Sequence, residues 1–560
     1  MKMKNKWKPA NDLSLETNAM SAATETKQCL MLTAGPGSGK TEVLAQRADF
    51  LLRTGACPYP KRILAISFKV DASKNLKNRV RCRCGSTFSA RLDSYTFHSF
   101  AKQIIDRFRP ELKGSYALDI DYQIRETAIA RKQVRLEDLV PLAIEILNKS
   151  DIARRAIRLT YSDVFLDEFQ DCTEEQYNLL KLAFQGTKIR LTAVGDEKQK
   201  IMTWAGALDG VFQTFIDDFS AKTLALYQNF RSAPRLLRMQ NAIKKVFDPA
   251  LFTNDTNPIR EDGEIKILNF IDSKDEAKHL AKSIKYWIEQ EHLEPSEIAI
   301  LIRSQPNLYG EDLIKELEVM EVPYREEQKI QDLSTEPAAR LIVDYLSVIY
   351  GQREPEAWTR LMNQITHFHD YDNTSQQESV NSMRNFVKDQ IIILNSHKQK
   401  EDQSMNYRDF VRRFLNRVGI ETLSSLSHDY RSKDRLRQIV KETGAFIEES
   451  LNRGHSLLEA LQLFSDKIAV RVLTIHKSKG LEFDTVIILG VEQETFFNKN
   501  KKDELCAFFV GISRAKRRLI LTVCEQRPKP SAATGRWDVH RTPHTEFLSY
   551  ASPYLCKDQC

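Results

Sequence analysis

One glycine-rich segment constrains the fold of this chain more than any other feature: Ala34-Gly35-Pro36-Gly37-Ser38-Gly39-Lys40-Thr41. It follows the apolar run 29–33 and precedes a helical pattern of apolar residues over 43–51. Between a strand and a helix, such a loop lets backbone N–H groups surround phosphate oxygens. We expect Lys40 to reach the β- and γ-phosphates and Thr41 to ligate Mg²⁺. The segment therefore predicts an α/β nucleotide-binding domain rather than a plain glycine turn, with Ala34 standing where the strict pattern has glycine.

A pair of carboxylates, Asp167 and Glu168, follows another apolar run at 164–166. A bound triphosphate needs a further oxygen ligand for its metal ion, and Asp167 is placed to provide it. Glu168 is placed to orient and deprotonate an attacking water, which hydrolysis requires beyond binding. Alone, such a pair is typical of a solvated strand end. Together with the phosphate loop, it predicts a site that hydrolyses nucleotides.

Short apolar runs separated by helical stretches occur in two series, the pattern of parallel strands in α/β sheets. Polar, helical segments interrupt both series, so we predict two α/β cores, each carrying a mostly helical inserted domain. The runs are 29–33, 63–68, 164–166 and 189–194, then 265–270, 298–302, 472–475, 486–489 and 519–523. The predicted division is 1–104 and 161–253 around the insertion 105–160, then 254–344 and 466–560 around the insertion 345–465.

Composition excludes several classes of protein. With 42% hydrophobic and 28% charged residues, the 560-residue chain is neither disordered nor collagen-like. No apolar run approaches the roughly 18 residues of a membrane span, and no apolar stretch follows the N-terminal lysines, so we expect a cytoplasmic protein without a membrane partner. The nine cysteines are expected to stay reduced. A net charge of +7 is compatible with a polyanionic partner but does not require one.

Further motifs carry a resemblance to a known family. The chain resembles the UvrD/Rep/PcrA-like superfamily 1 DNA helicases, whose magnesium motif has the letters DEFQD found here at 167–171. The other matching segments, in the family's order, are 63–68 with the basic helix to 79, Thr96-Phe97-His98-Ser99-Phe100, the segment 194–199 with Trp204, Gln228-Asn229-Phe230-Arg231-Ser232, the TxHxxKGLEFD-like segment 474–484, and 509–516.

The resemblance implies two RecA-like P-loop domains that bind ATP and Mg²⁺ in the cleft between them. The implied catalytic residues are Lys40, Asp167, Glu168, Gln199 as γ-phosphate sensor, and the arginines Arg231 and Arg514. The implied nucleotide contacts are the loop Ala34, Gly35, Pro36, Gly37, Ser38, Gly39, Lys40 and Thr41, with Phe230 on the adenine and Glu482 on the ribose; the metal ligands are Thr41 and Asp167.

The resemblance also implies a path for single-stranded DNA along four side chains, Phe68, His98, Trp204 and His476. Aromatic faces stack on bases without reading their identity. A buried core aromatic is the alternative for Phe68. Two positions depart from the family pattern, Met202 for the usual tyrosine and Ala205 for the usual arginine, and the adenine-reading glutamine has no clear counterpart besides Thr17 or Asn18.

The implied activity is that of an ATP-dependent single-stranded DNA translocase and helicase, a hydrolase with 3′ to 5′ polarity that acts on single-stranded and tailed duplex DNA, as in DNA repair. The alternative is an ATP- or DNA-sensing regulatory subunit with a nuclease as protein partner, as in antiviral defence systems such as Gabija. A third interpretation, an RNA motor, is less favoured because the matching motifs are those of DNA enzymes.

Overall fold

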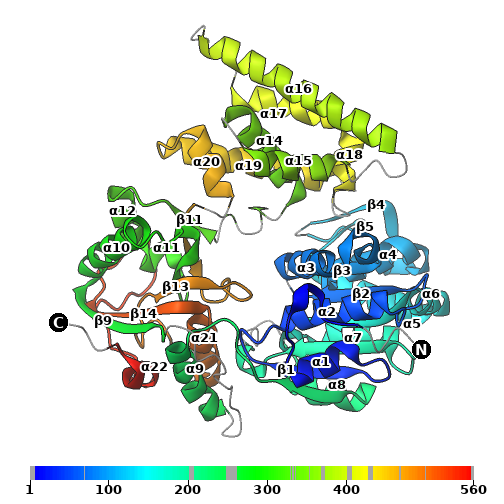
Figure 1. The fold of residues 1–560 in the computed structure, drawn as a ribbon, viewed down its shortest axis with the longest axis horizontal. Coiled ribbons are helices and arrows are strands. Elements are labelled where there is room, and N and C mark those ends of the chain that lie inside the picture. The colour runs from blue at the N-terminus through cyan, green and yellow to red at the C-terminus, as the bar shows by residue number, and fades with distance from the viewer. Residues whose placement is uncertain are drawn as a thin grey trace. The chain divides into compact units, whose positions relative to one another are not determined.

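The computed structural model (Figure 1) describes the chain from residue 7 to residue 556, with gaps at 69, 126, 201–206, 248–261, 328–329, 331–332, 335, 352–353, 367–372, 400–405, 427–429, 431–432, 466–467 and 498–499. The chain divides into two compact units. The first comprises 1–280, 297–316 and 473–560, and the second comprises 281–296 and 317–472.

A six-stranded parallel sheet organises the N-terminal part of the first unit. Its strand order is β3-β2-β6-β7-β1-β8, and all five neighbouring pairs are parallel. Side chains alternate between two apolar layers, since Leu30 and Leu32 join one cluster and Met31 joins the other. The strands are β1 (Leu30–Ala34), β2 (Arg62–Ser67), β3 (Leu92–Thr96), β6 (Tyr161–Leu166), β7 (Arg190–Gly195) and β8 (Lys222–Leu226).

Helices cover both faces of this sheet, which explains why its central strands are mostly buried. One layer contains α1 (Thr17–Thr24), α2 (Lys40–Arg53) and α3 (Val70–Ser89). The other contains α4 (Phe97–Phe108), α5 (Leu139–Lys149), α6 (Asp151–Thr160), α7 (Glu174–Phe184) and α8 (Val211–Phe219). We call this sheet and its helices the first core.

The segment 105–160, predicted to be a helical insertion, also contains the parallel strands β4 (Leu118–Ile124) and β5 (Arg131–Val134). Its helix α5 has an apolar stripe, with Leu139, Ala143 and Ile146 buried in the same cluster as Phe97 of α4. The helical part of this segment is therefore a layer of the first core. Short 3₁₀ turns lie at Arg109–Glu111, Gly114–Tyr116 and Leu136–Asp138.

A second sheet has the order β11-β12-β10-β13-β14-β9. Its parallel pairs include β10 with β13, β13 with β14 and β14 with β9. The strands are β9 (Glu264–Asp272), β10 (Ile298–Ile302), β11 (Tyr324–Glu326), β12 (Val470–Thr474), β13 (Phe483–Ile488) and β14 (Ala515–Gln526). Two parallel sheets with covering helices confirm the predicted α/β fold class.

Within the first unit, β9, β10, β13 and β14 form the second core with α9 (Pro234–Phe247), α21 (Lys501–Ile512) and α22 (Thr545–Ala551). The remaining helices near this sheet are α10 (Ser273–Glu289), α11 (Pro306–Tyr309) and α12 (Glu311–Val319). Further 3₁₀ turns are η2 (Ala10–Asp12), η6 (Phe169–Asp171), η7 (Glu197–Gln199), η9 (Pro295–Glu297) and η11 (Ser552–Tyr554).

The second unit is mainly helical and has its own core around α14 (Pro337–Tyr350). Tyr345 of α14 stacks on Phe414 with ring centroids 4.0 Å apart. The long helix α16 packs on α14 and α15 (Figure 1). The other helices are α15 (Pro355–Thr366), α16 (Asn373–Gln399), α17 (Tyr407–Val418), α18 (Ile420–Ser425), α19 (Lys433–Asn452) and α20 (Leu457–Phe464).

Over the part of the chain that the structure describes, no helix is both long and apolar enough to cross a membrane.

Candidate active site

The phosphate loop connects the end of β1 at Ala34 to the start of α2 at Lys40. Gly37 has a φ of +72°, and a Cβ there would lie 2.7 Å from the Cβ of Arg231. Both observations require glycine at this position. The Lys40 ammonium donates to the Ala34 carbonyl oxygen over 3.3 Å, so it folds back over the loop where phosphates would bind.

Two carboxylates follow β6 directly. Asp167 continues the sheet through its backbone N–H, which donates to the Ile66 carbonyl. Glu168 has a φ of +53°, an uncommon conformation for a residue with a side chain. Its carboxylate accepts a 2.6 Å hydrogen bond from Gln170 and lies 3.8 Å from the ammonium of Lys479.

The pKa values of the two carboxyl groups are shifted in opposite directions. Burial and then the neighbouring charge of Glu168 raise the pKa of Asp167. Burial acts in the same direction on Glu168, but the ammonium groups of Lys40 and Lys479 outweigh it and hold the pKa of Glu168 below its usual value. Glu168 is therefore the ionised member at neutral pH, as a general base must be.

A chain of buried polar groups leads from these carboxylates to the second core. The side-chain oxygen of Gln170 accepts from the backbone N–H of Asp196 over 3.0 Å. Gln199 donates to the Asp196 carboxylate over 2.8 Å and accepts a 2.7 Å hydrogen bond from Arg514. Arg514 is 2% exposed, and burial with the nearby Arg231 lowers its pKa to about 9.

Arg231 also lies at the phosphate loop. Its Nε donates to the Glu482 carboxylate over 2.9 Å, and its Nη1 donates to the Ser513 carbonyl over 3.0 Å. Glu482 was predicted to contact a ribose, and in this structure its carboxylate pairs with Arg231. The Arg231 guanidinium is therefore held by residues of the second core, near Arg514. Its backbone lies at the phosphate loop of the first core.

Phe230 is 52% exposed beside the start of α2, where a Cβ on Gly39 would lie 3.8 Å from its ring. Its backbone N–H donates to the Gly37 carbonyl over 2.8 Å. The N-terminal candidates for base recognition behave differently: Asn18 donates to the Ala225 carbonyl over 2.7 Å, and Thr17 is exposed. The ring of Phe230 is thus accessible for stacking on a base.

Family models match most of the chain at these same segments. The UvrD/REP helicase N-terminal domain matches residues 15–126 and 111–220, and the UvrD-like helicase C-terminal domain matches 224–391 and 364–526. The chain belongs to the UvrD/Rep helicase family. The phosphate loop and the Asp167–Glu168 pair of this helicase lie in the N-terminal match, and Arg231 and Arg514 lie in the C-terminal match.

Curated relatives agree with this assignment at low identity. The chain is 25% identical to DNA helicase II of Escherichia coli (strain K12) over 92% of this chain and 85% of that protein. It is 24% identical to the ATP-dependent DNA helicase Rep of the same organism over 90% of this chain and 89% of that protein. It is 23% identical to the putative ATP-dependent DNA helicase YjcD of Bacillus subtilis (strain 168), over 94% and 81%. The protein is thus an ATP-hydrolysing enzyme of the helicase class.

Two site residues of this helicase were not predicted from the sequence, Lys479 and Asp171. The Lys479 side chain is 4% exposed, and its ammonium pairs with the Asp171 carboxylate and donates to the Gln199 carbonyl over 3.0 Å. Both residues stand inside motifs that were recognised, 474–484 and 167–171, so the signal was present. The contact between the two residues was not predicted, because 308 positions separate them in the sequence.

The DNA-facing candidates lie at the ends of neighbouring strands or in the second core. Phe68 follows β2 and packs on Phe97 with ring centroids 5.2 Å apart, so the ring is partly a core residue. His98 follows β3, and burial lowers its pKa. His476 of the second core lies 3.4 Å from a guanidinium nitrogen of Arg303. Trp204, with Met202 and Ala205, lies outside the described residues.

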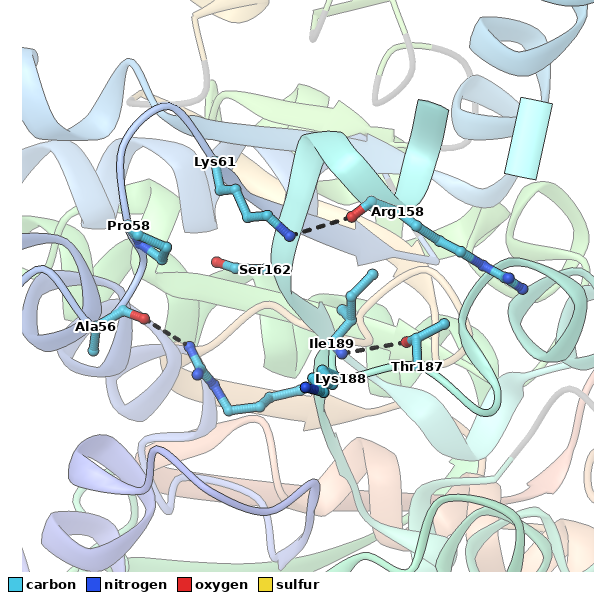
Figure 2. A pocket seen from close by; sticks show the side chains of 9 residues that line it. Ala56, Pro58, Lys61, Arg158, Ser162, Thr187, Lys188 and Ile189 are labelled. Carbon is cyan, nitrogen blue, oxygen red and sulfur yellow. Dashed lines mark hydrogen bonds between the residues drawn. The ribbon is translucent and has the colours of Figure 1, made fainter. Parts of the chain in front are cut away.

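A separate cavity of about 370 Å³ opens at the amino ends of β6 and β7 (Figure 2). Because all strands of the sheet are parallel, this edge is opposite to the phosphate loop. Three cations in its wall are engaged within the protein: Arg190 binds the Asp163 carboxylate, Arg158 donates to backbone carbonyls, and Lys61 donates to the Arg158 carbonyl over 3.4 Å. The other lining residues are Ala56, Pro58, Ser162, Thr187, Lys188 and Ile189.

Proposed function

We propose that this helicase is a single-stranded DNA translocase that moves 3′ to 5′ and unwinds tailed duplexes inside the cytoplasm, driven by ATP hydrolysis at the phosphate loop. The observation that carries the proposal is the 2.7 Å hydrogen bond between Arg514 of the second core and Gln199 of the first core. Events at the phosphates can pass through this bond to the other core, which is the coupling that a motor requires.

In this proposal, the backbone of the phosphate loop and Lys40 hold the β- and γ-phosphates. Thr41 and Asp167 would hold Mg²⁺ together with phosphate oxygens, and the ion would neutralise charge on the transferring group. A hydroxyl and a carboxylate fit this ion, which prefers oxygen ligands, and Asp167 lies close enough to Lys40 to feel its charge.

Glu168 orients and deprotonates the attacking water, since it is the ionised carboxylate of the pair. Arg231 and Arg514 stabilise the charge that spreads over the phosphate oxygens as the bond breaks. When ATP binds, Arg514 exchanges Gln199 for phosphate oxygen. When phosphate leaves, the bond to Gln199 forms again, so the two cores change their contact once in each cycle.

DNA contacts on both cores would convert this cycle into movement. Phe68 and His98 belong to the first core and His476 to the second, so alternating grip by the two cores shifts the strand in steps. Aromatic stacking of about 1 to 3 kcal/mol per base suits a motor that tolerates any sequence. The polarity and the use of tailed duplexes follow from the family resemblance.

ATP hydrolysis by the full chain, with and without single-stranded DNA, tests the proposal beside a Lys40→Ala variant. We expect strong stimulation by DNA, weaker stimulation by an RNA oligomer, and loss of hydrolysis in the variant. Strand displacement from 3′-tailed and 5′-tailed duplexes then tests polarity, and displacement only from the 5′-tailed substrate would contradict it. Hydrolysis that survives in Lys40→Ala would show that the phosphate loop is not the site.

A second function, a regulatory subunit that senses ATP or DNA for a partner nuclease in antiviral defence, is favoured by the sequence departures at Met202 and Ala205. These positions lie in the motif that resembles the family's coupling segment. The distinguishing measurement is strand displacement by the protein alone. ATP hydrolysis without displacement, restored or redirected only when a nuclease partner is added, would favour this alternative.

A further inference from the structure

A buried lysine on the second core lies against the phosphate loop of the first core. Lys244, on α9, is 2% exposed. A Cβ built on Gly35 would lie 3.4 Å from the Lys244 ammonium nitrogen and 3.9 Å from its Cε. The end of the Lys244 side chain therefore lies beside Gly35 of the loop.

The helix that carries Lys244 is fixed to the second core. Leu236, Met239 and Ile243 of α9 are buried in the same apolar cluster as β14. At the start of this helix, the Ser232 hydroxyl donates to the Ala515 carbonyl over 3.0 Å. Lys244 thus belongs to the same rigid part as the segment 513–516.

This helix also follows directly from the segment that bears Arg231. Asn229 of that segment donates to the Pro36 carbonyl over 2.8 Å, and Phe230 donates to the Gly37 carbonyl. The segment therefore contacts the loop at residues 36 and 37, while Lys244 contacts it at Gly35. The segment 229–231 and Lys244, which belong to one continuous stretch of the second core, thus both lie on the phosphate loop.

The surroundings of Lys244 are unfavourable for a lysine that serves only packing. The charged groups that act on it include the Asp196 carboxylate, which favours its charge, and the ammonium groups of Lys198 and Lys40, which oppose it. Burial is the largest effect and lowers the pKa of Lys244 to about 8. A triphosphate on the loop would add several negative charges next to this ammonium. These charges would offset the free-energy cost of burying the charged lysine.

We propose that Lys244 binds the phosphates of the nucleoside triphosphate on the loop 34–41, as a third cation supplied by the second core beside Arg231 and Arg514. This inference rests on the proposed ATP site and extends it. Because the lysine moves with the second core, its contact with phosphate is made when the two cores are closed on a triphosphate. Lys244 therefore favours ATP over ADP.

A purely structural role makes a different prediction. If Lys244 served only to pair with Asp196, its loss would loosen the turn η7 and affect all nucleotides alike. A phosphate-binding role affects the triphosphate selectively. The ratio of the two affinities separates these possibilities, and overall activity does not.

The experiment uses the full chain with Lys244→Met and Lys244→Arg, and Lys245→Met as the matched control, since Lys245 is the next residue of α9 and is exposed. Titration calorimetry measures the affinities for a non-hydrolysable ATP analogue and for ADP in the presence of Mg²⁺. Losing a charge-assisted hydrogen bond corresponds to about a tenfold to hundredfold change in affinity. We expect this loss for the ATP analogue in Lys244→Met, with ADP changed less than about twofold, partial recovery in Lys244→Arg, and wild-type values in Lys245→Met.

Equal weakening of the analogue and ADP, or no change in either, overturns the inference. A lower thermal midpoint without a change in the affinity ratio overturns it as well, because it indicates a structural role. The Lys40→Ala variant keeps this result distinct from a failure of the proposed function. If Lys40→Ala still hydrolyses ATP, the ATP site itself is wrong; if it does not and Lys244→Met keeps the wild-type ratio, only the role of Lys244 is wrong.

Discussion

At the scale of single residues, Glu168 shows how its surroundings determine its role. Its backbone occupies the left-handed region at φ +53°, and Gln170 holds its carboxylate. Such strain is retained where the surrounding structure fixes a side chain for function. Two ammonium groups, from Lys40 and Lys479, keep it ionised although it is partly buried. One of these cations comes from each core, so the charge state of Glu168 depends on both.

Replacing Glu168 by glutamine tests its role as the base. The amide has nearly the same shape but cannot accept the proton of water, so we expect ATP turnover to fall by about 10² or more while binding of the ATP analogue is retained. Steady-state hydrolysis and calorimetry measure the two quantities. Glu175→Gln, on the exposed face of α7, is the control. Turnover within a few-fold of wild type would assign the base elsewhere.

The low pKa of Lys244 predicts a pH dependence. The ammonium is charged below pH 8 and loses its charge above it, because burial lowers its pKa to about 8 against the pull of Asp196, with Lys198 and Lys40 adding to the decrease. The dependence of kcat/KM on pH reports the free enzyme, so it should fall as pH rises through about 8. Lys244→Arg keeps its charge and should lack this step. A step of the same size in that variant would assign the titration to another group.

At the scale of secondary-structure elements, the sequence predicted the central strands and the edge strand β9, and missed the edge strands β3, β8 and β11. The runs 63–68 and 189–194 correspond to β2 and β7, which are buried on both faces. The edge strands β3 and β8 each have one buried side chain, Leu92 and Leu226, and their sequences, LDSYT and KTLAL, are not continuous apolar runs. Hydrophobic patterning detects apolar runs, so an edge strand with polar residues, such as β3 or β8, gives little signal.

The candidate site follows the same rule. Residues within one motif lie together in the structure, because the turn from β1 to α2 is local. Contacts such as Lys479 with Asp171 join residues 308 positions apart, and no pattern in the sequence encodes that proximity. The burial of Lys244 had no signal for a second reason, since a lysine on an amphipathic helix is typical of a solvated face.

The loop between β1 and α2 predicts a sharp effect of Gly37→Ala. A Cβ at this position would lie 2.7 Å from the Cβ of Arg231, and φ is +72°. The alanine must therefore displace Arg231 or distort the loop, and we expect loss of nucleotide binding and hydrolysis. Gly186→Ala is the matched control, because its φ is +70° with nothing within 4 Å of the added carbon. Calorimetry should show normal binding for the control, and equal behaviour of the two variants would contradict the steric argument.

At the scale of the whole molecule, the contacts between the first and second cores gather at one place. Arg514 bonds Gln199, Lys479 bonds Asp171, and Arg231 lies on the phosphate loop through Gly37. All three cations come from the second core, and the loop and carboxylates come from the first. In water these charges would interact weakly, but in a buried site each contact depends strongly on distance. Small movements between the cores therefore change the electrostatic interactions at the ATP site. A change of charge at the ATP site can in turn move the cores.

Gln199 is the residue through which this coupling can be broken without removing a catalytic charge. Gln199→Ala leaves Lys40, Glu168 and both arginines in place but removes the hydrogen bonds to Asp196 and Arg514. We expect basal ATP hydrolysis to fall only a few-fold and its stimulation by single-stranded DNA to fall about tenfold or more, since the two cores lose their shared hydrogen bond. The ratio of hydrolysis rates with and without DNA measures this effect.

Gln213→Ala, an exposed glutamine of α8 that bonds only Asp217 among the contacts described, should keep the wild-type ratio. If Gln199→Ala also keeps the wild-type ratio, the coupling between the ATP site and DNA does not pass through Gln199. It would then run through the contact of Lys479 with Asp171, and Lys479→Met should abolish the stimulation by DNA.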